Sequence, residues 1–193
     1  MANGKVCTGF SKPYVAKYEA SGTTVTYTSG QILARGVSVT ASPETSDDNN
    51  FYADNITAEN EPGVFTGGTV TLTVDGLLQS AEKLIMGLPT AGDDGLIAYG
   101  DAMAIPDVGI GFIARYQSGG VVSYTPIIFP RAAFALIESE ANTQEVTIDW
   151  QTQELTATIK CAEDANRNWK YVGGELETEA AAEAVIKTFF SIN

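Results

Sequence analysis

The sequence predicts a mainly β fold, a sandwich or barrel of mostly antiparallel strands with one central packed α-helix and a C-terminal helix. Apolar and polar residues alternate with period two in several runs, and turn-forming residues separate these runs. Helical periodicity is confined to two segments, and neither a repeat of fixed period nor a low-complexity linker divides the chain. The 193 residues are therefore expected to form one domain, 1–193.

Three alternating runs in the N-terminal part are predicted to be strands, after an N-terminal arm at residues 1–8. The first run, TVTYT at 24–28, follows a Ser-Gly turn. The other two, 36–41 and 69–74, are predicted to be half buried, because alternate side chains of a strand point to the same face. Their inward residues are expected to be Val37, Val39 and Ala41 in one run and Val70, Leu72 and Val74 in the other.

The C-terminal part contains two predicted hairpins and a short strand. Residues 109–116 and 121–129 flank the sequence QSGG, whose paired glycines suit a turn that needs positive φ. Residues 145–150 and 154–160 form a second candidate pair. A last short strand is expected at 169–172.

The first predicted helix spans residues 76–86. Asp75 is placed to cap its start, and Gly87 and Pro89 are placed to end it. Its apolar residues fall on one face and are expected to pack against the sheet: Leu77, Leu78, Ala81, Leu84 and Ile85.

The second predicted helix lies within the C-terminal segment 175–193, near residues 178–190. Thr178 is placed to cap it, and Glu179 and Lys187 match the polarity of the helix dipole. The residues expected to be buried are Val185, Ile186, Phe189 and Phe190.

The charge of the chain argues against tight binding to nucleic acid. It has 24 acidic and 11 basic residues and no histidine, which gives a net charge of -13 at pH 7. Such a chain repels the phosphates of DNA.

Cysteine content and hydropathy favour a cytoplasmic origin. Cys7 and Cys161 are too few for a disulfide framework and are expected to be unpaired in a reducing compartment. The chain has no run of 18 apolar residues, and its first ten residues lack the apolar centre of a signal peptide. The sequence therefore predicts a soluble protein, made in a cytoplasm, that does not associate with a membrane.

The motifs of the common enzyme classes are missing. The sequence has no histidine to act as a general base, and no CxxC, HExxH, GxSxG or GxxxxGK[ST] motif. Two carboxylates that act on a sugar remain an alternative, but the sequence singles out no such pair. The run 47–50, Asp-Asp-Asn-Asn, offers calcium-type oxygen ligands without the DxDxDG spacing, so a turn-forming loop is favoured. We expect no catalytic residue, no metal and no cofactor.

Aromatic residues leave one alternative function open, a non-catalytic carbohydrate-binding or surface-adhesion β-sandwich module. Those that would line a sugar-binding face are Tyr116, Tyr124, Phe129, Trp150, Trp169 and Tyr171. Core packing and cross-strand pairing are favoured for them, because aromatic residues are enriched in strands generally.

The segment 42–66 is predicted to be an extended acidic loop or hairpin without a basic residue. Its carboxylates are Glu44, Asp47, Asp48, Asp54, Glu59 and Glu61. A second acidic stretch, 93–107, also lacks a basic residue. Two solvated loops are one interpretation of these stretches. In a ring of copies, the same residues would line a lumen or a ring-stacking surface of one sign, past which anionic cargo moves without binding.

Several motifs, in this order, carry a resemblance to a known family. They are GFSKPYVAKYE, TYTSG, GVSVTASPE, FYADN and GGTVTLTVDGL, followed by GIGFIARYQSGG and the stretch from YTPIIF to TATIK. The series, from about residue 9 to residue 160, resembles the major tail tube proteins of long-tailed phages and prophages, specifically the phi13 type. The family element FYADN falls on Phe51, Tyr52, Ala53, Asp54 and Asn55.

The resemblance implies a tail-tube-like fold and a structural role in the virion tail, after synthesis in the cytoplasm of the bacterial host. Hexameric rings of the chain would stack into a tube through which DNA passes without tight binding. The implied partners are further copies of the chain and other tail proteins, such as the tape measure, tail terminator and distal tail proteins. Residues 42–50 are a candidate ring-to-ring contact. We expect the FYADN element on a hairpin strand whose partner begins near Gly67, with at least one of its aromatic rings buried in the assembly.

Overall fold

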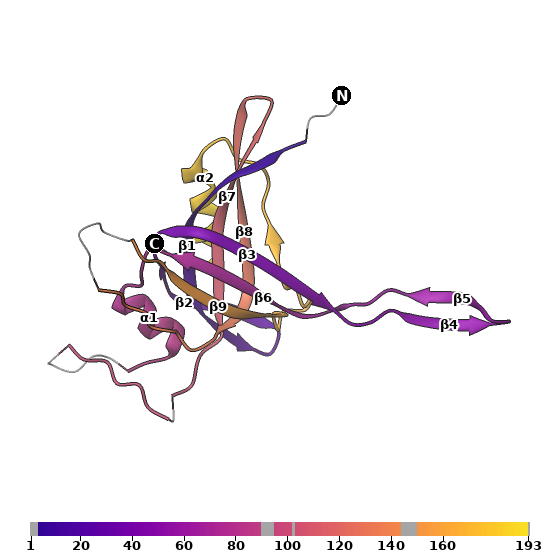
Figure 1. Ribbon diagram of the computed structural model, residues 1–193, viewed down its shortest axis with the longest axis horizontal. Helices are drawn as coiled ribbons and strands as arrows, with labels where there is room; N and C mark the ends of the chain where they lie inside the picture. Colours follow the sequence, from indigo (N-terminus) through magenta and orange to yellow (C-terminus); the bar gives the residue numbers. More distant parts are fainter. Residues whose placement is uncertain (1–3, 90–94, 102, 144–149, 193) are drawn as a thin grey trace.

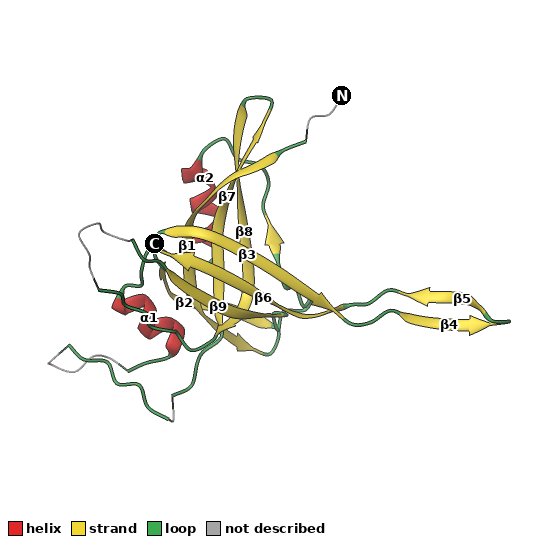
Figure 2. Cartoon of the chain, viewed as in Figure 1, coloured by secondary structure: helices red, strands yellow, loops and turns green. Residues whose placement is uncertain are grey.

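The computed structural model describes residues 4–89, 95–101, 103–143 and 150–192. Strands dominate, and two helices pack against them, which confirms the predicted mainly antiparallel β fold (Figure 2). The strands are β1 (Val6–Ser21), β2 (Thr24–Ile32), β3 (Gly36–Thr45), β4 (Asn49–Ala53), β5 (Ile56–Glu61), β6 (Phe65–Val74), β7 (Val108–Ser118), β8 (Val121–Phe134), β9 (Gln153–Lys160) and β10 (Tyr171–Val172). The helices are α1 (Gln79–Met86) and α2 (Glu179–Phe189).

One large antiparallel sheet forms the body of the molecule (Figure 1). Its strand order is β2-β1-β7-β8-β9-β6-β3, and the short β10 pairs with β8. The sheet curls, so that β1 comes close to β3 although these two strands are not neighbours in the order. Phe10 of β1 fills the space above Gly36 of β3, where a Cβ would overlap its ring. The result is a sandwich-like body around one main core.

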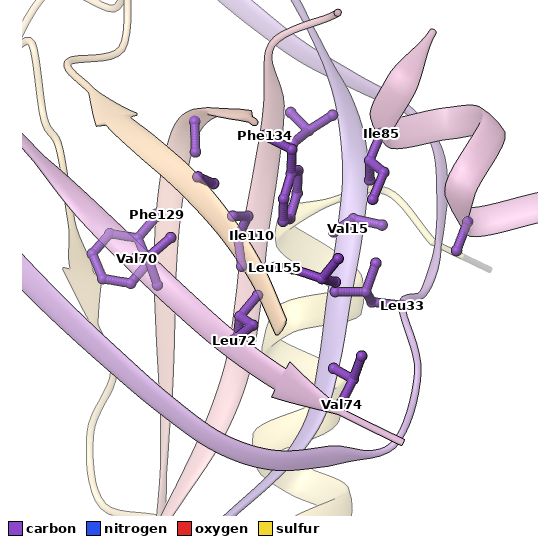
Figure 3. Close-up of a cluster of buried hydrophobic side chains, with 14 of the residues drawn as sticks. Val15, Leu33, Val70, Leu72, Val74, Ile85, Ile110, Phe129, Phe134 and Leu155 are labelled. Carbon is purple, nitrogen blue, oxygen red and sulfur yellow. The ribbon is translucent and has the colours of Figure 1, made fainter. Parts of the chain in front are cut away.

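The main core lies inside this curled sheet (Figure 3). Val70, Leu72 and Val74 of β6 are fully buried, as their period-two spacing predicts. Leu155 and Ile159 of the neighbouring β9 alternate inward in the same way. A slip of one residue in this register would turn the whole apolar set outward, so the burial pattern fixes the pairing.

The start of α1 differs from the prediction. The helix begins at Gln79 rather than Gly76, and its N-cap residue, Leu78, makes no side-chain cap hydrogen bond. Asp75 is not a cap, because its carboxylate accepts hydrogen bonds from the backbone N–H and the guanidinium of Arg35 instead. The predicted end is confirmed, since Gly87 has a φ of 65° and adopts the left-handed conformation of a C-cap.

The inward face of α1 is partly as predicted. Ala81 and Ile85 are fully buried, and Leu77 and Leu84 pack partly buried against the main core. The prediction for Leu78 is wrong, because this side chain is 61% exposed. The helix starts one residue after Leu78, so helical periodicity does not apply there. Met86, which was not among the residues predicted to face inward, is fully buried.

The second helix, α2, confirms the predicted cap and most of the predicted face. The hydroxyl of Thr178 accepts a hydrogen bond from the backbone N–H of Ala181, at 3.2 Å. Ile186 and Phe190 are buried in a second apolar cluster, against which Phe189 packs partly buried. Val185 is 42% exposed, so its predicted burial is wrong. The other buried members of the cluster are Tyr14, Ala16, Ile113, Ile128 and Ala182.

The prediction that one face of β3 is buried is wrong for two of its three residues. Val37 is 55% exposed and Ala41 is exposed, whereas Val39 packs partly buried against the main core. Two features explain the difference. β3 is an end strand of the sheet, and a register shift between Gly36 and Ser38 interrupts the alternation.

The remaining sequence predictions concern turns and termini. The β7–β8 hairpin has the predicted turn, in which Gly119 and Gly120 both have positive φ. β9 pairs with β6 and with β8, and residues 144–149, which include most of its predicted partner, lie outside the described residues. The predicted last strand is β10. β1 begins at Val6, inside the expected N-terminal arm, and both cysteines are free as expected.

Candidate assembly surface

A long two-stranded ribbon projects from the body of the molecule (Figure 1). β3 and β6 pair with each other, and β4 and β5 continue the ribbon beyond them. At its tip, Asp54 and Asn55 have φ values of 51° and 63°, as in a two-residue type I′ turn. Asp and Asn tolerate this left-handed conformation better than most residues do. We call residues 46–64 the distal hairpin.

Hydrogen bonds between its two arms close the base of the distal hairpin. The backbone N–H of Ser46 donates to the carbonyl of Val64 at 2.9 Å, and the N–H of Val64 donates to the Ser46 hydroxyl at 3.1 Å. The carboxylate of Asp48 accepts from the N–H of Gly63 at 2.9 Å. A Cβ at Gly63 would overlap the backbone oxygen of Ser46, so a glycine is required there. The predicted loop 42–50 is therefore the end of β3, a hydrogen-bonded neck and the start of β4.

The FYADN element is placed differently from the prediction. Its partner strand begins at Ile56 rather than near Gly67, because Asp54 and Asn55 form the turn. A register shift between Phe51 and Tyr52 interrupts the expected alternation. In the single chain, both rings are exposed, at 63% for Phe51 and 64% for Tyr52. Burial of one ring in an assembly remains a prediction.

All six predicted acidic residues of the ribbon are exposed: Glu44, Asp47, Asp48, Asp54, Glu59 and Glu61. Five of them belong to the distal hairpin, and Glu44 lies in β3. No basic residue occurs between Arg35 and Lys83, so nothing on the ribbon itself neutralises these carboxylates. The ribbon therefore presents a surface of one sign.

The second acidic stretch is not a uniform solvated loop. Asp93 and Asp94 lie outside the described residues. Asp107 is a structural anion, because its carboxylate binds Arg131 at 2.6 Å and Lys160 at 2.7 Å. Burial opposes ionisation of this group, but the hydrogen bonds from Lys160 and Arg131 hold its pKa below the usual value.

Most of the cations are engaged within the chain. Among the residues that the structure describes, seven of the 11 basic residues form ion pairs: Lys5, Lys12, Lys17, Arg35, Arg131, Lys160 and Lys187. The densest group surrounds Glu183 of α2, whose carboxylate accepts hydrogen bonds from Lys12 and from the Tyr14 hydroxyl, and pairs with Lys187 at 2.9 Å. These contacts, with Lys12 first, lower the pKa of Glu183 to about 2. These pairs reduce the basic charge that is available to phosphate.

Two further features of the ribbon and sheet suit association with another chain. β2 and β3 end the strand order, so each has one edge without a strand partner in the part of the chain that the structure describes. Unpaired strand edges are templates for pairing with another strand. The ribbon also exposes large apolar side chains, namely Phe51, Tyr52, Ile56 and Val64.

The aromatic residues considered for a sugar-binding face do not gather on one surface. Phe129 is fully buried in the main core, and Trp169 stacks on Phe65 with ring centroids 4.4 Å apart. Tyr124 and Tyr171 pack against the second cluster. Tyr116 lies under the Lys5 ammonium, and Trp150 is 84% exposed.

Searches for other types of site add little. Comparison of the chain with protein-family models and with curated proteins finds no match. Within the described residues, no group of three or more Cys, Asp or Glu side chains is arranged to hold a metal ion. No helix in the same residues has the length and apolar character needed to cross a membrane. The exposed ribbon and the two strand edges are therefore the features from which a function is inferred.

Proposed function

We propose that this protein is a structural, self-assembling subunit, which forms hexameric rings that stack into a phage tail tube and let DNA pass. The observation that carries the proposal is the projecting ribbon, which exposes two aromatic rings and the five carboxylates of the distal hairpin in the single chain. Exposed apolar groups on an extended element are typical of a protein interface. The order of the tail-tube-like motifs along the sequence gives this interface its specific interpretation.

The open strand edges support association between copies. A free edge of β3 or β2 can extend the sheet into a neighbouring chain through backbone hydrogen bonds. Such a contact joins different surfaces of two copies, and contacts of this type generate rings when the rotation closes. The edges and the ribbon thus provide one contact within a ring and another between rings.

The charge supports a conduit that does not retain its cargo. The chain carries a net charge of -13, and seven of its basic residues are already paired with carboxylates. A ring of such chains would present negative potential to a phosphate backbone, and salt would only partly screen it. DNA would therefore move through the ring without tight contact.

Microscopy and sedimentation of the full chain test the proposal. We expect six-fold rings and stacked tubes at high protein concentration. The double variant Phe51→Ser/Tyr52→Ser should assemble more weakly, whereas Leu136→Ser, which alters a 65% exposed apolar residue outside the ribbon, is the matched control. A wild-type chain that stays monomeric at every concentration and salt condition would contradict the proposal.

A carbohydrate-binding or adhesion module is the second candidate, and Trp150 is the observation that favours it. This exposed ring borders a polar groove of about 730 Å³ whose lining includes Glu138, Asn142 and Gln151. Carboxylate and amide groups beside an aromatic ring suit sugar hydroxyls and the apolar face of a sugar. Calorimetric titration with oligosaccharides tests this candidate, and loss of a binding signal in Trp150→Ala would support it.

A further inference from the structure

A groove with basic side chains and no carboxylate in its lining lies between the sheet and α1. Its volume is about 530 Å³, and its lining includes Lys17, Ser29, Gln31, Ser80, Lys83 and Leu84. In a chain with a net charge of -13, a groove of this kind is a local exception. Its chemistry suits an anionic ligand whose backbone also offers hydrogen-bonding groups to Ser and Gln side chains.

Both lysines of the groove are available to such a ligand. Lys17 pairs with Glu19 at 3.0 Å, but both side chains are 47% exposed. An exposed pair of this kind contributes only about 0–1 kcal/mol, so Lys17 can change partner at little cost. Lys83 takes part in none of the ion pairs found within the described residues.

The complementary surface is the distal hairpin of the same protein. It carries Asp47, Asp48, Asp54, Glu59 and Glu61 and no basic residue. It lies at one end of the long axis of the molecule, and α1 lies toward the other end (Figure 1). The hairpin of one chain is therefore held away from its own groove and is free to reach the groove of another.

We propose that the groove lined by Lys17 and Lys83 binds the distal hairpin of a second copy of this chain, through ion pairs with the hairpin carboxylates. The inference rests on the proposed self-assembly and names the docking site of the ribbon. Because the two surfaces are different and lie toward opposite ends, each added copy presents a new hairpin or a new groove. The contact is thus propagated from head to tail along a growing stack.

Charge reversal on the full-length chain tests this contact. The groove variant is Lys17→Glu/Lys83→Glu, and the hairpin variant is Glu59→Lys/Glu61→Lys, which changes two exposed strand residues. The charge-matched control is Lys5→Glu/Arg167→Glu, which changes two exposed residues outside both surfaces. Assembly is followed by sedimentation velocity and electron microscopy, and circular dichroism verifies that each variant is folded.

We expect the groove variant to assemble about 10-fold more weakly than the charge-matched control, and the hairpin variant about 10-fold more weakly than wild type, because like charges then face each other. The quadruple variant, with both surfaces reversed, should regain assembly. A groove variant that assembles as well as the control, or a quadruple variant that does not recover, overturns the docking site while leaving the proposed function intact. A wild-type chain that never assembles overturns both.

Duplex DNA is the competing ligand for a basic groove. Wild-type chain that retains DNA in a gel at low salt, with the retention lost in Lys17→Glu/Lys83→Glu but not in the control, would identify the groove as a nucleic-acid contact and overturn the proposal. Absence of retention in wild type, in the groove variant and in the control supports the hairpin as the ligand.

Discussion

Phe65 and Trp169 stack face to face, with ring centroids 4.4 Å apart and ring planes 6° from parallel. Phe65 is the first residue of β6 and directly follows the distal hairpin, and Trp169 comes from the segment before β10. This pair therefore fixes the base of the projecting ribbon to the C-terminal part of the chain.

The first prediction concerns this stack. Trp169→Ala should lower the free energy of unfolding by about 2 kcal/mol, because it removes a partly buried aromatic ring and its stacking partner's contact. Trp150→Ala is the control, since that ring is 84% exposed and its loss should change stability by less than about 0.5 kcal/mol. Denaturant unfolding followed by far-ultraviolet circular dichroism measures both. Equal midpoints for the two variants would show that the stack does not stabilise the fold.

The second prediction concerns the packing of the C-terminal end of α2 against the sheet. A Cβ at Gly109 would overlap the ring of Phe190 and lie 2.8 Å from Cε1 of Tyr27. Gly109→Ala should therefore destabilise the protein by about 1–3 kcal/mol through overpacking. At Gly174, a Cβ would meet nothing within 4 Å, so Gly174→Ala should have little effect. Thermal melts that shift equally for both variants would argue against a tightly packed α2.

The third prediction separates the two faces of α1. Ile85→Ala should cost about 2–5 kcal/mol, because this side chain is fully buried in the main core. Leu78→Ala should cost less than about 0.5 kcal/mol, because Leu78 is 61% exposed. Thermal unfolding of the two variants provides the comparison. A large effect of Leu78→Ala in assembled material alone would instead place this residue at a contact between copies.

The fourth prediction concerns pH and Glu183. Its pKa falls from 4.5 to about 2 in the folded chain, chiefly through the hydrogen bond from Lys12. A depressed carboxyl pKa stabilises the fold above pH 4.5, and this contribution is lost as the pH falls from 4.5 toward 2. Glu183→Gln should therefore be less stable than wild type by about 2 kcal/mol at pH 7, the typical contribution of hydrogen bonds to a charged group. The difference should shrink below pH 4.5.

Denaturant midpoints measured between pH 7 and pH 3 check this dependence. Glu177→Gln is the control, because Glu177 is exposed and close in sequence to the same helix. The control should be as stable as wild type at pH 7, because its side chain is exposed. A Glu183→Gln variant that stays equally destabilised at pH 7 and pH 3 would mean that the carboxylate acts through packing rather than charge.

The fifth prediction concerns DNA. The isolated chain and any ring it forms should not retain duplex DNA, because the net charge is -13 and most of the cations are paired. A gel shift at low ionic strength is the strictest measurement, since low salt strengthens any contact with phosphate. Submicromolar retention would contradict the proposed conduit and point to a basic surface such as the groove lined by Lys17 and Lys83.

Local patterns in the sequence are sufficient to predict the strands that form the core. Val70, Leu72 and Val74 are predicted correctly because β9 pairs with β6 without a register shift, and Thr178 because its cap hydrogen bond reaches only three residues ahead. Asp75 was misplaced for a non-local reason, since its carboxylate is taken by Arg35, 40 positions earlier.

The candidate site was less accessible to prediction. The acidic character of the ribbon is evident in the sequence, but the turn at Asp54 and Asn55 lies inside an element that resembled one continuous strand. The adjacent Asp and Asn were the available signal for this turn. The basic groove was not predictable, because it brings together Lys17 of β1 and Lys83 of α1, which are distant in sequence.

The absence of basic residues from Gly36 to Glu82 has a practical consequence for proteolysis. Trypsin has no cleavage site there, so digestion leaves the whole ribbon in one peptide that ends at Lys83. A glutamate-specific protease has a site after Glu59, in a hairpin with few contacts to the core, whereas Pro62 blocks cleavage after Glu61. Exposed segments of this kind are preferred sites of nicking, and burial in an interface removes them from the enzyme. The rate of cleavage after Glu59 therefore reports, without any label, which fraction of the chains has its ribbon engaged.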